Sequence, residues 1–165
     1  MNGGLKAELK RAVFLDRDGT IIEDRDYLKR VEDVVIFPGA AAALKRLQDA
    51  GFRLFIVSNQ SGVRFEKIYF APEAPEQPSR GRKPSPQFLF DARDEFGVDL
   101  GGSYMIGDKL IDLECGWNAG VKKSLLVRTG YGAKLEKAWP EKLGQAIVAD
   151  DLAGAVRRIK EVQNA

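Results

Sequence analysis

Short apolar runs alternate along this chain with amphipathic segments, and this alternation constrains the fold more than any single motif does. Strands are predicted over residues 12–15, 52–57, 68–70, 104–106, 124–127 and 146–148. Helices are predicted over residues 40–50, 86–96 and 110–119, and in a last segment capped by Asp151. Alternating strands and helices form a parallel sheet covered by helices on both faces. The predicted fold is therefore α/β, a Rossmann-like three-layer sandwich with a mainly parallel sheet.

Helix boundaries are marked by residues with suitable backbone preferences. Gly51, Gly97 and Gly120 follow three of the predicted helices, where a left-handed glycine commonly ends a helix. Ser85 and Pro86 suit the N-cap and the first turn of the helix that Gly97 closes. The 165 residues suffice for one domain, with no large cap domain and with residues 1–10 as a loose extension.

Polar side chains follow three of the predicted strands. Asp16, Ser58 and Asp108 stand at the ends of the first, second and fourth strands. Ligands of open parallel sheets bind outside the carboxyl ends of the strands, so these side chains are expected to converge. Lys83, near the start of a helix, can join them.

The segment FLDRDGT places Asp16 and Asp18 two residues apart, just past a buried strand. Such a pair suits phosphoryl transfer. Asp16 can attack phosphorus as the nucleophile, while Asp18 can protonate the leaving oxygen and then activate water. A magnesium-dependent phosphatase is the predicted function.

Two anions beside a phosphate repel one another, which makes a divalent cation necessary, and an oxygen-rich site selects Mg²⁺. Asp108 is the expected additional metal ligand, with Asp112 one helical turn on, where it can hold a metal-bound water or orient Lys83. The Ser58 hydroxyl, the Asn59 backbone N–H and the Lys83 ammonium can bind phosphoryl oxygens.

Composition excludes several other classes of function. The 26 basic and 24 acidic residues are spread along the chain, which gives no reason to expect nucleic acid or a membrane as a partner. Histidine is absent and Cys115 is the single cysteine, so neither an intramolecular disulfide nor a cysteine cluster for zinc is possible. A cytoplasmic location is expected, because no signal-like or membrane-spanning apolar run occurs.

Four motifs together resemble the haloacid dehalogenase (HAD) superfamily of phosphatases. They are DRDGT, SNQSG, RKPSP and GDKLID, and LLVRTG extends the match. The sequence is most similar to the branch that includes heptose bisphosphate and histidinol phosphate phosphatases, over roughly residues 12–160. The substrate that this resemblance implies is a small phosphorylated metabolite, namely a sugar (heptose) bisphosphate, with histidinol phosphate as the alternative.

The resemblance also implies roles for individual residues. Catalysis is expected of Asp16, Asp18, Ser58 and Lys83. Metal binding is expected of Asp16, the Asp18 backbone carbonyl and Asp108. Substrate contacts are expected of Asp24, Tyr27, Ser58, Asn59, Gln60, Ser61, Arg82, Lys83 and Lys109. Among these, Arg82 carries a guanidinium that can hold a phosphate or sugar hydroxyls with two parallel donors.

The chain departs from the branch in two places. Where the branch carries cysteine and histidine ligands for structural zinc, this chain has Ala71, Glu73, Ser79 and Gly81, so no zinc is expected. The connection after SNQSG is only residues 60–67, too short for the usual crossover helix. Three explanations stay open here: different pairing of residues 68–70, a missing strand, or a missing segment.

Two functions from other classes compete with the phosphatase. A receiver-type signalling domain also uses a phosphorylated aspartate, but its acidic pair follows the first strand and its phosphorylated aspartate follows the third. A protein that binds a phosphorylated ligand without turnover would not need a nucleophile beside an acid. A monomer or a small homo-oligomer is expected.

Overall fold

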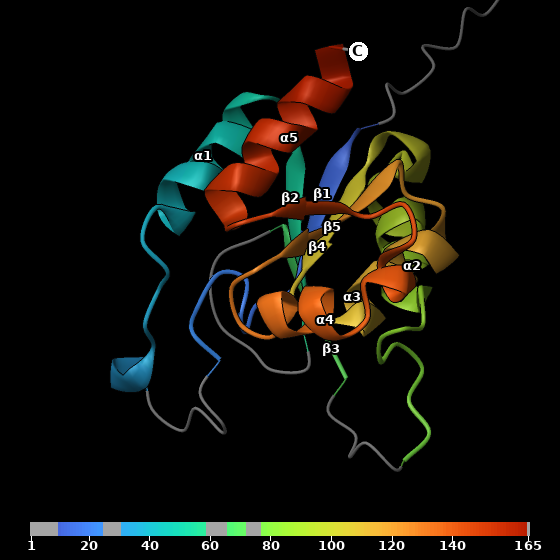
Figure 1. The fold of residues 1–165 in the computed structure, drawn as a ribbon. Helices are drawn as coiled ribbons and strands as arrows, with labels where there is room; N and C mark the ends of the chain where they lie inside the picture. Colours follow the sequence, from blue (N-terminus) through green and yellow to red (C-terminus); the bar gives the residue numbers. More distant parts are fainter. Residues whose placement is uncertain (1–9, 25–30, 59–65, 72–76, 165) are drawn as a thin grey trace, which may run out of the picture.

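A six-stranded parallel sheet forms the centre of the molecule (Figure 1). The computed structural model describes residues 10–24, 31–58, 66–71 and 77–164. The strands are β1 (Ala12–Leu15), β2 (Arg53–Ser58), β3 (Lys67–Phe70), β4 (Tyr104–Gly107), β5 (Lys123–Val127) and β6 (Ile147–Ala149). Their order, β3-β2-β1-β4-β5-β6, confirms the predicted fold class. It differs from the 2-1-3-4-5 order of receiver-type sheets, so the receiver alternative is wrong.

β1 is one of the two central strands, and all four of its residues are buried. It pairs in parallel with β2 and with β4, so that Leu15 lies beside Ile56 and Ile106. Strands buried on both faces read as continuous apolar runs, as the sequence of β1 does. Because all the strands run in one direction, the residues after β1, β2 and β4 emerge at a common edge.

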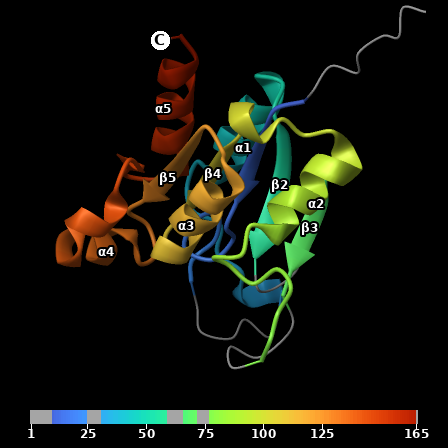
Figure 2. The same cartoon turned by 90° about the vertical axis from the view of Figure 1, so that its right-hand side faces the viewer.

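Helices cover both faces of the sheet (Figure 2). α1 (Ala40–Asp49) and α5 (Leu152–Asn164) lie on one face, over a core that includes Val13, Leu15, Ile56 and Ile106. α2 (Gln87–Phe96) and α3 (Leu110–Ala119) lie on the other face, over Phe14, Phe55 and Met105 among others. Alternate residues of a strand point to opposite faces, so β1 contributes to both cores.

α4 (Gly132–Ala138) was not predicted from the sequence. It is short, with Leu135 as its one large buried side chain, so it lacks the repeated apolar face that marks a helix. Together with the 3₁₀ turn Pro140–Leu143 it packs Leu135 and Leu143 against Leu126 of β5.

Element boundaries differ by a residue or two from those expected. α2 begins at Gln87, whose backbone N–H is 3.3 Å from the Ser85 hydroxyl, so Ser85 lies one residue further out than an N-cap. The Asp151 cap is confirmed, since its Oδ1 accepts a hydrogen bond of 2.7 Å from the Gly154 N–H. The predicted extension, residues 1–10, lies outside the described residues except for Lys10, which forms a bridge with Val98.

β3 forms despite the short connection that precedes it. It pairs in parallel with β2, with Phe55 beside Lys67 and Ser58 beside Phe70. The alternatives of a missing strand or a different pairing are therefore wrong. The connection itself, residues 59–66, is described only at Glu66, which forms an ion pair of 3.2 Å with Arg53. Nearly half of Phe70 is exposed.

Among the described residues, no helix is long and apolar enough to cross a membrane. The described ranges also contain no group of elements outside the sheet and its two helical layers that would form a cap domain.

Candidate active site

The carboxyl edge of the sheet brings together Asp16, Asp108, Asp112 and Lys83. Asp16 follows β1, Asp108 follows β4, and Asp112 lies in the first turn of α3. Lys83 Nζ lies 2.5 Å from Asp16 Oδ1 and 2.6 Å from Asp112 Oδ1. All four side chains are buried. The structure thus brings Asp16, Asp108 and Lys83 together at this edge, as the sequence predicted.

α3 fixes the position of Lys83, which comes from a loop outside the sheet. The loop runs to the start of α2 through a cis peptide bond between Lys83 and Pro84. Asn118 Nδ2 donates to the Pro84 carbonyl at 3.1 Å, and the Cys115 thiol donates to the Ser85 carbonyl at 3.2 Å. The ammonium is thereby directed between two carboxylates.

Asp112 is held by two groups. Its Oδ1 faces Lys83, and its Oδ2 accepts a hydrogen bond of 2.9 Å from the Lys109 backbone N–H at the start of α3. Gly107 allows this approach, because a Cβ there would lie 2.3 Å from the Asp112 side chain. Asp112 thus orients Lys83 toward Asp16, which is one of the two roles predicted for it.

Burial and mutual repulsion govern ionisation of the cluster. Burial raises the pKa of Asp16 to about 7; the Lys83 ammonium opposes this shift, and the Asp112 and Asp108 carboxylates add to it. Burial likewise raises the pKa of Asp108 to about 6, against the hydrogen bond from the Tyr131 N–H. Burial opposes protonation of Lys83, but Asp112 and Asp16 outweigh it and raise the pKa of the ammonium. Two of the three buried carboxylates, Asp16 and Asp112, thus share the Lys83 ammonium.

The cluster fits a magnesium ion. One carboxylate oxygen from each of Asp16, Asp108 and Asp112 lies within 4.8 Å of the others. Asp108 Oδ2 accepts a hydrogen bond of 2.8 Å from the Tyr131 N–H, whereas Asp108 Oδ1 is buried without a hydrogen-bond partner. An orphaned buried carboxylate oxygen is costly, and an all-oxygen donor set is the one Mg²⁺ prefers. Both carboxylate oxygens of Asp112 are engaged, Oδ1 by Lys83 and Oδ2 by the Lys109 N–H, whereas Lys83 contacts only Oδ1 of Asp16. Asp16 and Asp108 are therefore the better candidates for direct ligands.

Asp18 lies apart from the buried cluster. Its carboxylate faces Arg17, whose Nε and Nη2 lie 3.0–3.2 Å from the two carboxylate oxygens. One fifth of the Asp18 side chain is exposed, in contrast to Asp16. A group that must exchange protons with a leaving oxygen and with water needs such access. The pairing with Arg17 was not anticipated from the sequence.

The other predicted residues are placed unevenly. Ser58 ends β2 as a buried residue, at the edge where Asp16 lies. Lys109 Nζ lies 3.1 Å from Asp24 Oδ2, so the structure brings these two together. Arg82 is half-buried, with Nη2 3.5 Å from the Ala71 carbonyl. Four predicted contacts lie outside the described residues, namely Tyr27, Asn59, Gln60 and Ser61.

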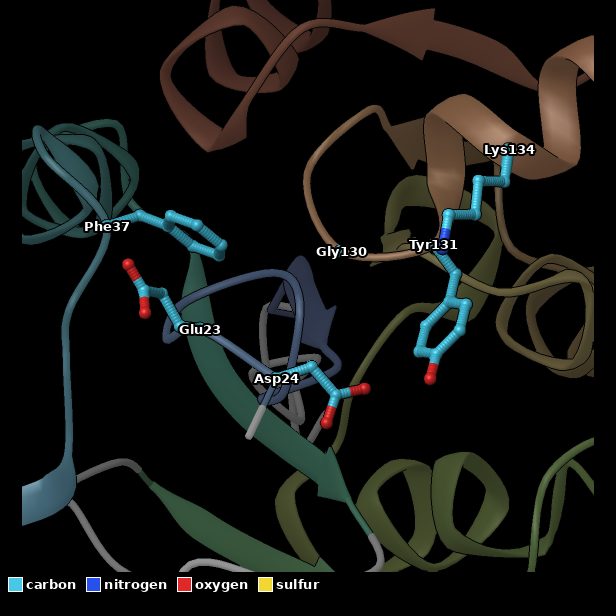
Figure 3. Close-up of a pocket in the computed structure, with 6 residues that line it drawn as sticks. All are labelled: Glu23, Asp24, Phe37, Gly130, Tyr131 and Lys134. Carbon is cyan, nitrogen blue, oxygen red and sulfur yellow. The ribbon is translucent and has the colours of Figure 1, made fainter. Parts of the chain in front are cut away.

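A pocket of about 400 Å³ lies beside Tyr131, whose backbone N–H donates to Asp108 (Figure 3). Glu23, Asp24 and Phe37 line one side, and Gly130, Tyr131 and Lys134 line the other. The turn after β5 lies close to the segment after β1. Only glycine fits at position 130, since a Cβ there would lie 2.6 Å from the Gly19 Cα. Apart from Asp24, none of the lining residues was singled out from the sequence. The one available signal was the LLVRTG motif, which contains Gly130.

The loop before Lys83 is held by an ion pair. Arg80 Nη1 and Nη2 lie 2.5 and 2.6 Å from the two carboxylate oxygens of Asp91 on α2. Ser79 Oγ accepts a hydrogen bond of 3.2 Å from the Arg82 N–H, and Gly81 packs on the Phe88 ring, where a Cβ would lie 2.3 Å away. These contacts occupy two of the positions where the resembling branch has zinc ligands.

The absence of zinc stays a prediction, and elemental analysis of the purified protein tests it. We expect less than stoichiometric zinc, because the described part of this loop offers no thiolate or imidazole. In buffer without added Mg²⁺, dialysis of the purified protein against a zinc chelator should leave its melting temperature unchanged. One tightly bound zinc per chain would contradict the prediction.

Comparisons with known proteins agree with this geometry. The sequence model of the HAD-hydrolase-like family matches residues 81–155. The D-glycero-beta-D-manno-heptose-1,7-bisphosphate 7-phosphatase of Haemophilus ducreyi is 37% identical over an alignment of 160 positions, which covers 77% of this chain and 88% of the relative. The D-glycero-D-manno-heptose-1,7-bisphosphate 7-phosphatase of Thermosynechococcus vestitus is 33% identical over 187 positions, covering 90% and 94%.

A solved structure shows the same fold. The D,D-heptose 1,7-bisphosphate phosphatase of B. bronchiseptica, complexed with magnesium and phosphate, superimposes with a TM-score of 0.79 at 28% identity, covering 94% of this chain and 99% of that one. The alignment with the Thermosynechococcus relative has 187 positions against 165 residues here, so at least 22 of its positions have no counterpart in this chain. This chain therefore lacks internal sequence that this relative has.

Proposed function

The chain belongs to the HAD-like hydrolase family, and we propose that it removes the 7-phosphate of D-glycero-D-manno-heptose 1,7-bisphosphate with Asp16 as the nucleophile. Its relatives are named phosphatases, so the chain is a phosphoric monoester hydrolase. The observation that carries the proposed mechanism is the contact of Lys83 with both Asp16 and Asp112 beside Asp108. It supplies a nucleophile, a cation and a metal-binding carboxylate in one place.

In the first step, an Asp16 carboxylate oxygen forms a bond to phosphorus as the bond to the leaving oxygen breaks. Asp18, once turned from Arg17 toward the substrate, donates a proton to that leaving oxygen. The products are the free sugar hydroxyl and an aspartyl phosphate at Asp16. Asp18 suits this role because it is partly exposed and lies two residues after the nucleophile in sequence.

Charge on the transferred group is offset by residues around it. The Lys83 ammonium contacts an Asp16 oxygen at 2.5 Å, so it lies where the phosphoryl oxygens arrive, and the Ser58 hydroxyl at the end of β2 can donate to them. Asp16, the Asp18 backbone carbonyl and Asp108 would hold Mg²⁺, which when bound neutralises the carboxylates and polarises the phosphoryl group.

In the second step, water attacks the phosphorus of the aspartyl phosphate. Asp18, now ionised, accepts a proton from this water as the new bond forms, and Asp16 leaves as a carboxylate. Inorganic phosphate is released, and both aspartates return to their starting states. The same carboxyl group thus serves as acid and then as base.

The substrate is proposed from the relatives and is tested with a panel of phosphate esters. The relatives named above act on heptose 1,7-bisphosphate by name, which favours this sugar over histidinol phosphate. With Mg²⁺ present, kcat/KM for either anomer of heptose 1,7-bisphosphate is expected to exceed that for histidinol phosphate about 100-fold or more, since the site must match groups remote from the scissile bond. A preference for histidinol phosphate would sink this assignment.

The raised pKa values of Asp16 and Asp108 make the stability of the protein depend on pH. The pKa of Asp16 rises from 3.8 to about 7 and that of Asp108 to about 6, so the folded metal-free protein binds protons more tightly than the unfolded chain. Its stability should therefore fall as pH rises from 3.8 to about 7. Mg²⁺ requires ionised carboxylates, so the stabilisation it gives should grow over the same window.

Thermal melts with and without Mg²⁺ measure this effect. At ten times the dissociation constant the ion should add about 1.4 kcal/mol. We expect its effect on the melting temperature to be larger near pH 8 than near pH 5.5, with Ca²⁺ as a control for ion size. Equal increments at both pH values would contradict the assignment of Asp16 and Asp108 as ligands.

A cytoplasmic location and a monomeric or small oligomeric state stay predictions.

A further inference from the structure

The loop that carries Lys83 is hydrogen-bonded within itself as well as to its surroundings. Ser85 Oγ donates a hydrogen bond of 3.1 Å to the Arg80 carbonyl, and the Ser85 N–H donates one of 3.0 Å to the Arg82 carbonyl. The Arg82 N–H in turn donates to Ser79 Oγ at 3.2 Å. A segment with many internal contacts moves as one unit, so a contact at either end of this loop also places the lysine within it.

α3 holds one side of the loop through a row of side chains. Residues three apart lie next to one another along a helix, and three side chains of α3 form such a row. Asp112 contacts the Lys83 ammonium, and Asn118 at the other end of the row donates a hydrogen bond of 3.1 Å from Nδ2 to the Pro84 carbonyl. The Cys115 thiol, between them, donates to the same loop. Six residues of helix rise by about 9 Å, so Asn118 does not reach the transferred phosphoryl group.

α2 holds the other side of the loop. Arg80 Nη1 and Nη2 lie 2.5 and 2.6 Å from the two carboxylate oxygens of Asp91. Gln87 Nε2 donates a hydrogen bond of 3.1 Å to Asp91 Oδ1, which keeps this carboxylate turned toward the loop. A bidentate pair sets both the distance and the orientation of the groups that it joins. Because α2 and α3 cover the same face of the sheet, the loop is held from two helices of one layer (Figure 2).

The outermost of these contacts add little to stability. The Arg80 side chain is 64% exposed, and Asn118 is exposed as well. Water can replace the partners of exposed groups, so such ion pairs and hydrogen bonds change the free energy of unfolding only slightly. Catalysis is more sensitive to geometry, since misplacement of a reacting group by about 1 Å can cost about 100-fold in rate. The same contacts can therefore matter little for folding and much for the position of the Lys83 ammonium.

We propose that Asn118 and Asp91 are positioning residues for Lys83. Asn118 fixes one side of the loop and Asp91 fixes the other, so that the ammonium between them stays where it meets the phosphoryl group transferred to Asp16. Both act through the lysine and not on the substrate. This inference rests on the proposed function, because it requires that Lys83 acts on a phosphoryl group, but it does not depend on which phosphate ester is the substrate.

Turnover of p-nitrophenyl phosphate with Mg²⁺ tests the proposal, because the phosphate of this ester is the group that is transferred. Asn118→Ala and Asp91→Asn should each lower kcat about fivefold, with a smaller effect on KM, since the charge on the transferred group is offset less well. The melting temperature should hardly change. Gln48→Ala and Asp94→Asn are the matched controls, as exposed residues of α1 and α2 that do not contact the loop, and both should keep the wild-type kcat.

Conservative variants show whether the contacts themselves are required. Asp91→Glu should recover most of the lost kcat, because its carboxylate can still reach Arg80. Asn118→Asp should lose as much as Asn118→Ala, because it keeps the size of the side chain but has no donor for the Pro84 carbonyl. Wild-type kcat in Asn118→Asp would contradict the role assigned to this hydrogen bond.

The sharpest measurement repeats both changes in a protein that lacks Lys83. In the background Lys83→Met with Asp112→Asn, neither Asn118→Ala nor Asp91→Asn should lower kcat further, since residues that act through one group are not additive. Fivefold losses in this background as well, or wild-type kcat in both single variants, would overturn the inference and leave the proposed function standing. If the wild-type protein released phosphate from no ester, the proposed function would fail and this inference with it.

Discussion

Replacing Asp16 with asparagine is expected to abolish phosphate release while the protein stays folded. The amide cannot form the aspartyl phosphate, and removal of a nucleophile typically lowers kcat by about 10⁴-fold or more. The size of the side chain is kept, and its oxygen can still accept a hydrogen bond from Lys83, which lies 2.5 Å from Asp16 Oδ1. Because burial raises the pKa of Asp16 to about 7, loss of its charge costs the metal-free fold little.

Steady-state phosphate release with Mg²⁺ measures the activity of Asp16→Asn, and a thermal melt checks its fold. Asp94→Asn is the matched control, because Asp94 is an exposed aspartate on α2, paired with Arg93 and remote from the carboxyl edge of the sheet. It should retain wild-type turnover. If Asp16→Asn released phosphate at a rate near that of the wild type, another group would have to be the nucleophile.

Replacing Lys83 with methionine is expected to lower both activity and stability. The ammonium bridges Asp16 and Asp112 at 2.5 and 2.6 Å, and its side chain is 4% exposed. Without it, two buried carboxylates face one another, which typically costs about 3–5 kcal/mol. Turnover should fall about 10²-fold to 10³-fold, because the charge on the transferred phosphoryl group loses its protein cation.

A double variant separates the two effects of Lys83. Adding Asp112→Asn to Lys83→Met removes one of the stranded carboxylates, so the melting temperature should recover in part. Activity should not recover, because the cation is still missing. Lys137→Met, an exposed lysine, controls for loss of a positive charge. Full activity in the double variant would show that Lys83 acts only by stabilising the fold.

The strands and the placement of the reactive residues were predictable because they depend on local patterns. The apolar run of β1 specifies a buried strand, and a polar residue at its end must emerge at the carboxyl edge. The same reasoning placed Ser58 and Asp108. Lys83 meets Asp16 across 67 residues of sequence, and motif order alone brought it into the site.

Other features depend on tertiary contacts that no local pattern encodes. The Asp18 carboxylate turns to Arg17, although the DRD sequence reads equally well with the arginine in solvent. Tyr131 and Lys134 lie in a short turn and a short helix, without a repeated apolar face to signal them. The parallel pairing of β3 contradicts the usual length of a crossover, so a length rule could not decide it.

Capture of the phosphorylated enzyme tests transfer to Asp16 most directly. Enzyme mixed with heptose 1,7-bisphosphate and Mg²⁺ is quenched rapidly in acid and treated with borohydride, which reduces an aspartyl phosphate to homoserine and releases phosphate. Peptide mass spectrometry should then find homoserine at position 16 in the wild-type protein and none in Asp16→Asn. Homoserine at another aspartate, or unmodified Asp16 in enzyme quenched during rapid turnover, would contradict the mechanism.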